Sequence, residues 1–247
     1  MNRYYYDLHI HSCLSPCGDD DMTPNNIAGM ATLCGLNIVA LTDHNSCKNC
    51  PAFFAAAKQY GIIPVAGMEL TTAEDIHVVC LFENLEDAMA FDSEIEEHLV
   101  KIENRPEIFG KQQIMDENDE ETGIFPYLLI NATDIPIEGV PAVVEKHNGV
   151  CFPAHIDRQS NGMIAVLGTF PPEPKFGCAE VRDIESLDEL KKNYPILEGM
   201  LIVCDSDAHY LDHMRDKQAY FDLDDEPYSS ALVRRRLIEK IRKGAEP

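Results

Sequence analysis

Histidines and carboxylates recur in this sequence in short clusters at the ends of apolar runs. His9 and His11 stand two residues apart, where the run at residues 4–9 ends. In an extended chain, residues two apart point to the same side, so both imidazoles can reach one metal ion. Asp7 is expected on the same face, where a carboxylate can orient a histidine ligand. A His-x-His pair alone is more typical of two surface histidines than of a metal site.

Other residues of the same kind follow further apolar runs. They are Asp43, His44, Glu69, His155, Asp207 and His209, while His77 opens its run instead of closing it. The carboxyl ends of parallel strands in a barrel gather at one end, where active sites form. So many metal-type residues at strand ends favour a metal site over chance.

The ligand types indicate the metal and the reaction. Imidazole and carboxylate suit zinc, manganese or iron, whereas oxygen ligands alone would suit calcium or magnesium. Two such ions about 3.5–4 Å apart can activate a water and clamp the attacking and leaving oxygens of an ester. Glu69 has two oxygens to share and is the natural bridge between the ions. We therefore predict two or three divalent ions (Zn, Mn or Fe) and no protein nucleophile.

Two alternating patterns position these residues. Strand-like runs occupy residues 4–9, 37–42, 62–68, 77–82, 149–153, 178–181 and 200–204. Helices are expected at residues 24–34, 51–60, 85–103, 140–147 and 186–193, and a last one within 229–243, capped by Ser229 or Ser230. Strands that alternate with helices predict a parallel α/β sheet or barrel.

Residues 105–139 match neither period. They are either an insertion that covers the site or a long surface connection, and the second is favoured because no motif falls there. The acidic stretch at residues 115–123 is expected to be a solvated loop.

Composition limits the partners. The formal net charge is −23, from 43 Asp and Glu against 20 Lys and Arg. Such a surface repels duplex DNA and anionic membranes. We therefore expect a small phosphorylated substrate, and neither duplex nucleic acid nor a membrane as a partner. The N-terminus lacks the apolar segment of a signal peptide, so a cytoplasmic protein is expected. The sequence predicts no oligomeric state.

The remaining histidines and the nine cysteines are less informative. Without a secretory signal, reduced thiols or metal ligands are favoured over disulfides. Four cysteines flank the histidine clusters, where thiolate ligands are geometrically conceivable but weakly signalled: Cys13, Cys17, Cys47 and Cys50. Four lie in apolar runs and are expected in the core: Cys80, Cys151, Cys178 and Cys204. Three histidines are left out of the ligand set: His98, His147 and His213.

The motifs DLHIHS, LTDHN, GMEL, IHVVCLF, PAHIDR and SDAH follow one another over nearly the whole chain. In this order they resemble the PHP family, named for polymerase and histidinol phosphatase. The resemblance is to the stand-alone bacterial phosphoesterases more than to the long polymerase subunits. It implies a single PHP domain over residues 1–247, with a distorted (β/α)7 TIM-like barrel and a trinuclear metal site.

The resemblance also implies which residues hold the three metals. The first would lie on His9, His11, Glu69 and Asp207, and the second on Glu69, His77 and His155. The third would lie on His44, His209 and an acidic residue of the loop after the first strand. Many family members have Ser-Asp-Gly in that loop, whereas this chain reads SPCGDDDMTP at residues 15–24. Counting back from Pro24 favours Asp19, while Asp20 and Asp21 stay open.

Arg158 is the expected phosphate-binding residue. It follows His155 by three residues and so leaves the strand end at the mouth of the barrel. A guanidinium matches two phosphate oxygens with paired donors. The alternative is a surface salt bridge with Asp157 or with the acidic loop. Together with Glu69 and Asp207, Arg158 forms the predicted catalytic set.

These residues favour hydrolysis of a phosphate ester, in a small metabolite or a nucleotide. One alternative is an amidohydrolase-like metal hydrolase, since those barrels also begin with His-x-His. The early Glu69 and the pair of Asp207 and His209 argue against it. The other alternative is a metal-stabilised interaction module without catalysis. Such modules tend to lose ligands, whereas nearly every expected ligand position is filled here.

Overall fold

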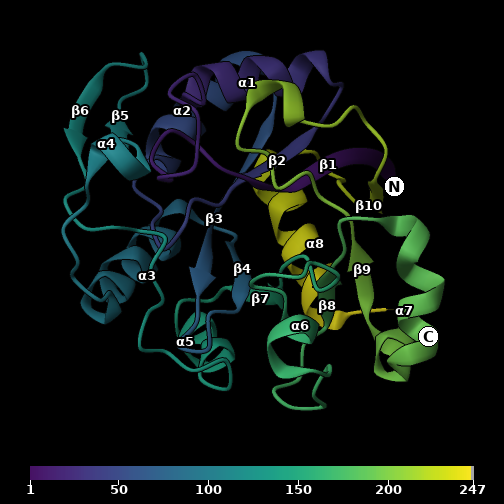
Figure 1. The fold of residues 1–247 in the computed structure, drawn as a ribbon. Helices are drawn as coiled ribbons and strands as arrows, with labels where there is room; N and C mark the ends of the chain where they lie inside the picture. Colours follow the sequence, from purple (N-terminus) through teal and green to yellow (C-terminus); the bar gives the residue numbers. More distant parts are fainter. Residues whose placement is uncertain (246–247) are drawn as a thin grey trace.

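A strongly curled β-sheet with helices on its outer side forms the centre of the computed structural model, which describes residues 1–245 (Figure 1). Six strands pair in the order β10-β1-β2-β3-β4-β7. Their bounds are β1 (Asn2–Ile10), β2 (Ile38–Leu41), β3 (Ile63–Thr71), β4 (His77–Phe82), β7 (Val150–Pro153) and β10 (Tyr220–Leu223). Two further strands, β8 (Cys178–Glu180) and β9 (Leu201–Val203), form a separate parallel pair.

Single backbone hydrogen bonds join this pair to the chain just beyond β7 on one side and just beyond β1 on the other. Ile156 N, just after β7, donates to Glu180 O of β8 at 2.9 Å. His11 N, just after β1, donates to Ala208 O beyond β9 at 3.0 Å. The strands β1, β2, β3, β4, β7, β8 and β9 thereby close into a distorted barrel, and β10 pairs only with residues 2–5 of β1. The predicted (β/α)7 TIM-like barrel is confirmed.

The expectation that all strands run parallel is wrong for β4. Strands β1, β2 and β3 are mutually parallel, but β4 is antiparallel to both β3 and β7. Only residues 72–76 separate β3 from β4, and a parallel connection needs a dozen or more residues. Because β4 is reversed, its first residue, His77, pairs with Thr71 at the end of β3. His77 therefore lies at the same end of the barrel as the other ligand candidates.

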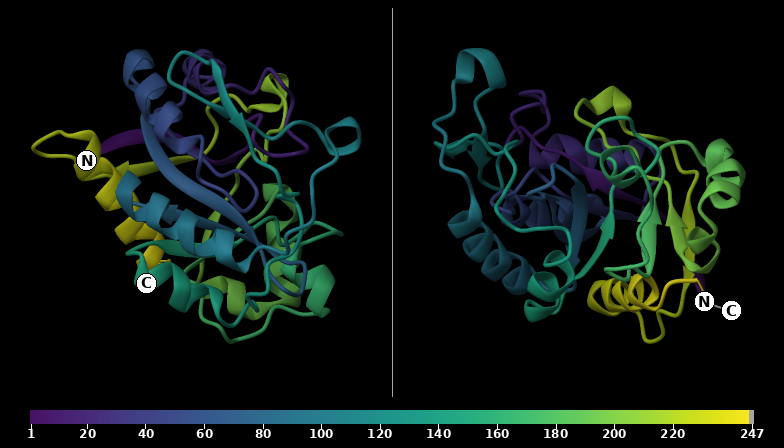
Figure 2. Two further views of the ribbon diagram at one scale, coloured as in Figure 1. Left: turned by 90° about the vertical axis from the view of Figure 1, so that its left-hand side faces the viewer. Right: turned by 60° about the horizontal axis from the view of Figure 1, so that its bottom comes forward.

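Helices cover the outer face of the barrel and one end of it (Figure 2). They are α1 (Pro24–Leu33), α2 (Cys50–Tyr60), α3 (Leu85–His98), α5 (Val140–Lys146), α6 (Met163–Leu167), α7 (Leu187–Asn193) and α8 (Ser230–Lys243). Ser229 caps α8, because its Oγ accepts a hydrogen bond from Leu232 N at 3.1 Å. Helix α3 ends five residues earlier than expected, where Leu99 turns extended and pairs with Thr133. Among the described residues, none of the helices combines the length and apolar character that a membrane crossing needs.

Two apolar clusters hold the barrel together. One fills the space between sheet and outer helices and includes Phe53, Met68 and Phe91. The other joins strand residues such as Val65 and Phe152 to the apolar side of α8. Helix α8 thus closes the end of the barrel opposite to the ligand candidates.

Strand β1 contains a bulge that decides which of its side chains face the site. The pairing of β1 with β2 shifts between Asp7 and Ile10. A bulge adds one residue and reverses the alternation of side chains beyond it. Leu8 therefore packs in the inner cluster, while His9 reaches the ligand cluster. Asp7 accepts hydrogen bonds from backbone N atoms of His9 and Ser206 and does not orient an imidazole, contrary to expectation.

Residues 105–139 are more ordered than the sequence suggested. They contain α4 (Pro106–Phe109) and a hairpin of β5 (Gln113–Met115) and β6 (Glu121–Ile124), at the upper left of Figure 1. Within the acidic turn, Asp119 accepts hydrogen bonds from Thr23 Oγ1 at 2.5 Å and Asn25 N at 3.1 Å. This turn is thus tied to the start of α1 and is not merely a solvated loop.

Candidate metal centre

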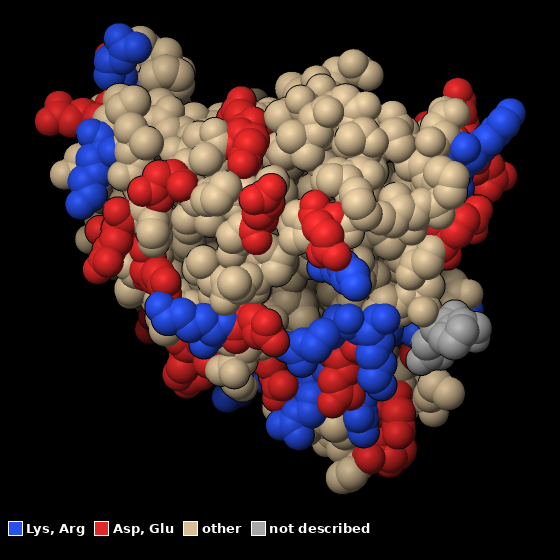
Figure 3. All heavy atoms as spheres, turned by 90° about the horizontal axis from the view of Figure 1, so that it is seen from below, with Lys and Arg blue, Asp and Glu red and all other residues tan. Residues whose placement is uncertain are grey.

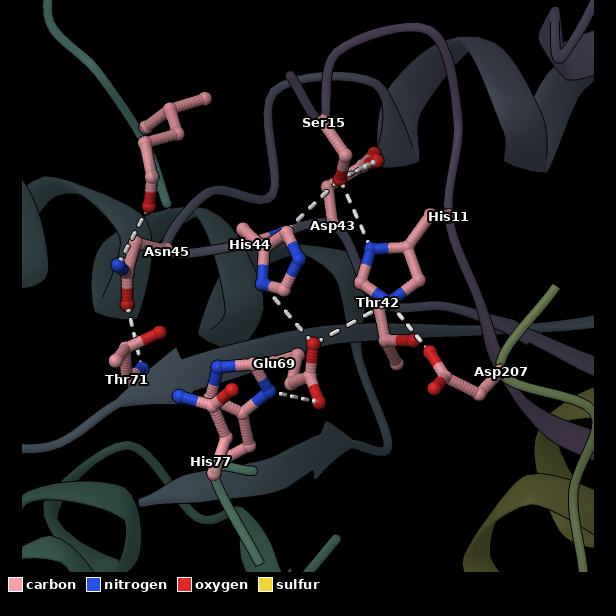
Figure 4. Close-up of polar contacts among 12 residues, drawn as sticks. His11, Ser15, Thr42, Asp43, His44, Asn45, Glu69, Thr71, His77 and Asp207 are labelled. Carbon is pink, nitrogen blue, oxygen red and sulfur yellow. Dashed lines mark hydrogen bonds and ion pairs between the residues drawn. The ribbon is translucent and has the colours of Figure 1, made fainter. Parts of the chain in front are cut away.

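The ligand candidates meet around the carboxylate of Glu69, and Figure 4 shows three of them, His11, His44 and His77, next to it. Five imidazoles surround it. His77 Nδ1 and His155 Nε2 lie 2.8 and 3.0 Å from Oε1, and His9 Nε2 lies 3.2 Å from it. His44 Nδ1 and His11 Nε2 lie 3.0 and 3.3 Å from Oε2. All six residues are buried. The carboxylate of Glu69 therefore has five imidazole nitrogens around it, which is more than its two oxygens can accept as hydrogen-bond donors.

The arrangement fits cations. His9 Nε2 and His11 Nε2 face each other at 3.1 Å. Within residues 1–245, the buried ligand-type atoms that make no hydrogen bond of good geometry include His44 Nδ1, Glu69 Oε2, His155 Nδ1 and Asp207 Oδ1. His44 Nδ1 and Glu69 Oε2 are 3.0 Å apart, which is close enough for an ion pair. Buried polar atoms are nearly always bonded, so converging unbonded donors and acceptors indicate bound ions. The donor set of imidazole and carboxylate suits zinc, manganese or iron.

Three groups of donor atoms lie close enough to hold an ion each. They are His9, His11, Glu69 and Asp207; His44, Glu69 and His77; and His11, His44 and His209. The first group has the composition implied for the first metal. The second group has Glu69 and His77, as implied for the second metal, but His44 in place of His155. His155 approaches the same Glu69 oxygen as His77. The third has His44 and His209, as implied, but no carboxylate from the loop after β1.

Asp19 lies beside this third group without joining it. Its backbone N donates to His209 O at 2.9 Å, and its Oδ1 accepts from Asp21 N at 2.9 Å. Asp20 pairs with Lys111 at 3.4 Å. A carboxylate ligand for a third ion is therefore still a prediction. Cys17, from the same loop, lines the pocket next to His44.

The electrostatics of the cluster depend on this crowding. Burial lowers the pKa of His11, but the carboxylates of Asp207 and Glu69 raise it to about 9. Burial likewise lowers the pKa of His44, and the carboxylate of Glu69 raises it to about 9. Burial and the neighbouring His11 lower the pKa of His209 to about 3. Burial raises the pKa of Glu69, but the surrounding imidazoles hold it well below its usual range. Without metal, protons on some of these histidines balance the carboxylates.

Second hydrogen-bond partners orient His9, in β1, and His11, just after it. Glu180 Oε2 accepts from His9 Nδ1 at 2.8 Å, and Ser15 Oγ lies 2.9 Å from His11 Nδ1. Ser15 in turn donates to Asp43 Oδ1 at 2.7 Å. Both rings therefore turn Nε2 toward the cluster, as metal ligands with a carboxylate behind them do. Glu180 was missed by sequence reasoning because it lies inside the apolar run at residues 178–181.

Backbone strain marks two of the ligand positions. His155 has φ of 30° and Asp207 φ of 52°, in a region that residues other than glycine seldom occupy. Such strain persists only where the surroundings enforce it, and it gathers at functional sites. Asn45, beside His44, shares this conformation and is held by hydrogen bonds to Leu129 O and Asn131 O at 2.7 and 2.8 Å. Residues 105–139 thus support the site from outside.

A pocket of about 540 Å³ opens over the cluster. Besides His44, His77, Asp207 and His209, its walls include Cys17, Ile130, Arg158, Arg182, Tyr210 and His213. Arg158 Nη1 lies 3.1 Å from Asp207 Oδ2, and not against Asp157, whose carboxylate accepts from the backbone N of Arg182. Arg182 and His213 were not predicted. The position of Arg182, just beyond β8, carried the same strand-end signal as the ligands.

The other cysteines and histidines have local partners. Cys47 and Cys50 donate to Gly67 O at 3.1 and 3.7 Å, and burial raises the pKa of Cys13 to about 12. None of the three donor groups found among residues 1–245 contains a cysteine. His98 pairs with Asp134 at 2.6 Å and His147 with Glu94 at 2.6 Å, away from the site.

Comparisons with known proteins agree with the resemblance in the motifs. The family model described as PHP domain matches residues 7–121. The 5'-3' exoribonuclease of Haemophilus influenzae is 35% identical over 79 residues, which are 31% of this chain and 28% of that protein. The chain spans half or less of the length of the curated relatives it matches.

Solved structures share the fold over nearly the whole chain. The lesion-specific endonuclease EndoQ of Pyrococcus furiosus has a TM-score of 0.65 at 18% identity, over 95% of this chain and 55% of that one. A putative metal-dependent phosphoesterase of Bifidobacterium adolescentis has a TM-score of 0.50 at 16% identity, over 98% and 96% of the two chains.

The expectation that duplex nucleic acid is excluded as a partner is wrong. A structure of Endonuclease Q was solved with a 27-mer duplex that carries an abasic lesion. It shares this fold with a TM-score of 0.62 at 16% identity, over 95% of this chain and 56% of that one. Net charge averages over the whole surface, whereas a phosphate is held locally by metals and arginines. Lys and Arg do gather on one face of this acidic protein, seen from below in Figure 3, where α8 lies, but this face is at the end of the barrel away from the ligand candidates.

Proposed function

We propose that this chain, which carries a PHP domain, is a metal-dependent phosphoesterase that acts on the phosphate of a nucleotide or of a nucleic acid strand. Two or three divalent ions, zinc, manganese or iron, would lie on the residues around Glu69. The observation that carries the proposal is the set of three adjoining donor groups beneath a pocket with two arginines.

Individual residues have separate tasks in this proposal. Glu69 belongs to two of the three donor groups, and it also contacts His11 and His44 of the third. It would therefore bridge neighbouring ions. Arg158 and Arg182 would bind the non-bridging oxygens of the phosphate from the pocket wall. When bound, the ions lower the pKa of water and polarise the phosphate. Asp207, which contacts Arg158 as well as His9 and His11, would keep the guanidinium at the phosphate position.

An amidohydrolase is the second candidate, since the barrel and the His-x-His pair are compatible with it. The walls of the pocket favour a phosphate, because two arginines face it. A neutral amide substrate needs no such pair of cations, whereas a dianionic phosphate does.

The test is a comparison of substrates and of two variants. Protein freed of metal with a chelator is reconstituted with Mn²⁺, Zn²⁺ or Fe²⁺ and assayed on mononucleotides, on single- and double-stranded oligonucleotides, and on amides. Glu69→Gln should lower the rate on phosphate esters at least about 100-fold, as the loss of a preorganised charge does. The matched control Glu97→Gln, at an exposed position of α3, should retain the rate. Hydrolysis of amides alone, or an unchanged rate in a folded Glu69→Gln protein, would contradict the proposal.

A further inference from the structure

A second pocket of about 480 Å³ adjoins the one over the metal ligands. It lies between the turn after β7 and the helices α6 and α7, and Arg158 lines both pockets. Its apolar wall consists of Ile156, Ile164, Leu190 and Tyr194. Its volume falls in the range of roughly 300–1,000 Å³ that is typical of small-molecule sites.

We propose that this side pocket binds the nucleobase attached to the reacting phosphate. The inference rests on the proposed function and names the part of the substrate that gives selectivity. The phosphate would lie at Arg158 over the metal ligands, and the base would enter between α6 and α7.

The polar groups of the side pocket suit a base better than a second phosphate. Among residues 1–245, no side-chain hydrogen bond or ion pair engages Gln159, Glu189 or Asn193, so their polar atoms are available to a ligand. Two amides and one carboxylate can donate to and accept from the edge of a heterocycle. The carboxylate of Glu189 would repel an anion. A flat, neutral ring with both donors and acceptors satisfies these walls.

The turn that carries Arg158 fixes the distance between the two pockets. Arg158 N donates to His155 O at 2.8 Å, and His77 N donates to Asn161 O at 2.9 Å. A Cβ atom on Gly162 would lie 2.6 Å from Arg158 O and 2.9 Å from His155 O, so the turn is closely packed. The backbone of Arg158 is thus fixed beside His155, and its guanidinium contacts Asp207 Oδ2 at 3.1 Å. A phosphate held by this guanidinium would present its nucleoside to the side pocket.

The experiment fills the side pocket and leaves the metal ligands unchanged. Ala165 lies on its wall and is exposed, so Ala165→Trp should occupy the space without disturbing the core. The variant should lower kcat/KM for adenosine 5'-phosphate about tenfold, chiefly through KM, as loss of a base contact does. Ribose 5-phosphate, which lacks the base, should be hydrolysed at an unchanged rate. The matched control is Val166→Trp, on the same helix but outside the pocket lining, which should leave both substrates unaffected.

Two substrate arms distinguish a free nucleotide from the end of a strand. An oligonucleotide with the same terminal nucleotide is assayed beside the mononucleotide, and a loss on either arm supports the proposal. If the Ala165→Trp enzyme is active and its kcat/KM falls equally for esters with and without a base, or does not fall at all, the side pocket does not bind the base. The proposed phosphoesterase activity would still stand. If the unmodified protein hydrolyses no ester, the proposed function fails, and calorimetric titration of adenosine 5'-phosphate into both proteins decides the pocket alone. Unchanged binding in Ala165→Trp would then overturn it.

Discussion

The two ends of the barrel use the same strands for opposite purposes. Toward α8, the strands contribute apolar side chains such as Val65 to the buried cluster that also contains Leu237 and Ile241 of α8. A few residues further along β3, the same strand contributes Glu69, and the backbone beyond β7 and β9 becomes strained at His155 and Asp207. The α8 end has the features of a stable core, while the ligand end retains buried atoms without partners. Stability and chemistry are thus separated along the barrel axis.

Removal of metal should have the largest effect at the ligand end, where it should make the stability of the protein depend on pH. In the metal-free protein, protonated His11 and His44 balance the buried carboxylates, and their pKa values of about 9 exceed the ordinary 6.5. A raised pKa in the folded state gives stability that is complete below about pH 6.5 and is lost as pH rises toward 9. The free energy of unfolding of chelator-treated protein should therefore fall over this interval.

Reconstitution with metal supplies the control for this dependence. Bound ions need neutral imidazoles and would take the place of the protons. The fall between pH 6.5 and 9 should then disappear, as followed by urea denaturation at several pH values. A metal-free protein whose stability rises over this range would show that the cluster does not hold protons as described.

At the α8 end, Leu237→Ala should change stability and not chemistry. Leu237 is fully buried between α8 and the strands, and removal of its side chain leaves a cavity. The free energy of unfolding should fall by about 2–5 kcal/mol. The matched control is Arg235→Ala on the exposed side of α8, where only the ion pair with Glu83 is lost. Metal content and kcat/KM of the folded Leu237→Ala protein should match the parent, and a large loss of either would couple the two ends.

The separation explains which features the sequence could predict. Residue type and position at strand ends suffice for the ligands, because only one end of a barrel gathers strand termini. His77 seemed misplaced because a short turn that reverses β4 has no signature in the ligand pattern. Asp7 was assigned the wrong role because a bulge in β1 breaks the alternation. The hairpin at residues 113–124 was missed because its strands are short and mix polar with apolar residues, and Ile114 packs on a small separate cluster of Leu14, Leu99, Phe125 and Leu129.

Glu180 is the clearest example of a site residue that the sequence could not reveal. Its substitution tests whether the ligand end of the barrel depends on a carboxylate behind His9. Nothing local distinguishes it in the run CAEV, and its partner His9 is 171 residues away. Glu180→Gln should weaken metal binding about ten- to a hundredfold, as loss of a carboxylate behind a histidine ligand does. Titration of the metal-free protein with Mn²⁺ or Zn²⁺ measures the effect. Glu185→Gln, at an exposed position nearby, is the control. Unchanged affinity would mean that Glu180 only fills space behind His9.

Arg158 should give the smallest of these effects, because it stands at the boundary between buried cluster and solvent. Its guanidinium lies 3.1 Å from Asp207 Oδ2, yet the side chain is 34% exposed. A charge-assisted hydrogen bond contributes roughly 1.5–3 kcal/mol, and partial exposure to water favours the lower figure. Arg158→Ala should therefore lower kcat/KM about tenfold on the best phosphate ester, and Arg158→Lys should recover only part of it. Metal content should stay unchanged, which separates a phosphate contact from support of Asp207. If Arg158→Ala retained full kcat/KM, Arg158 would not bind the phosphate, and the metal ions alone would hold it. If the variant lost metal, the role of Arg158 would be to support the ligand Asp207.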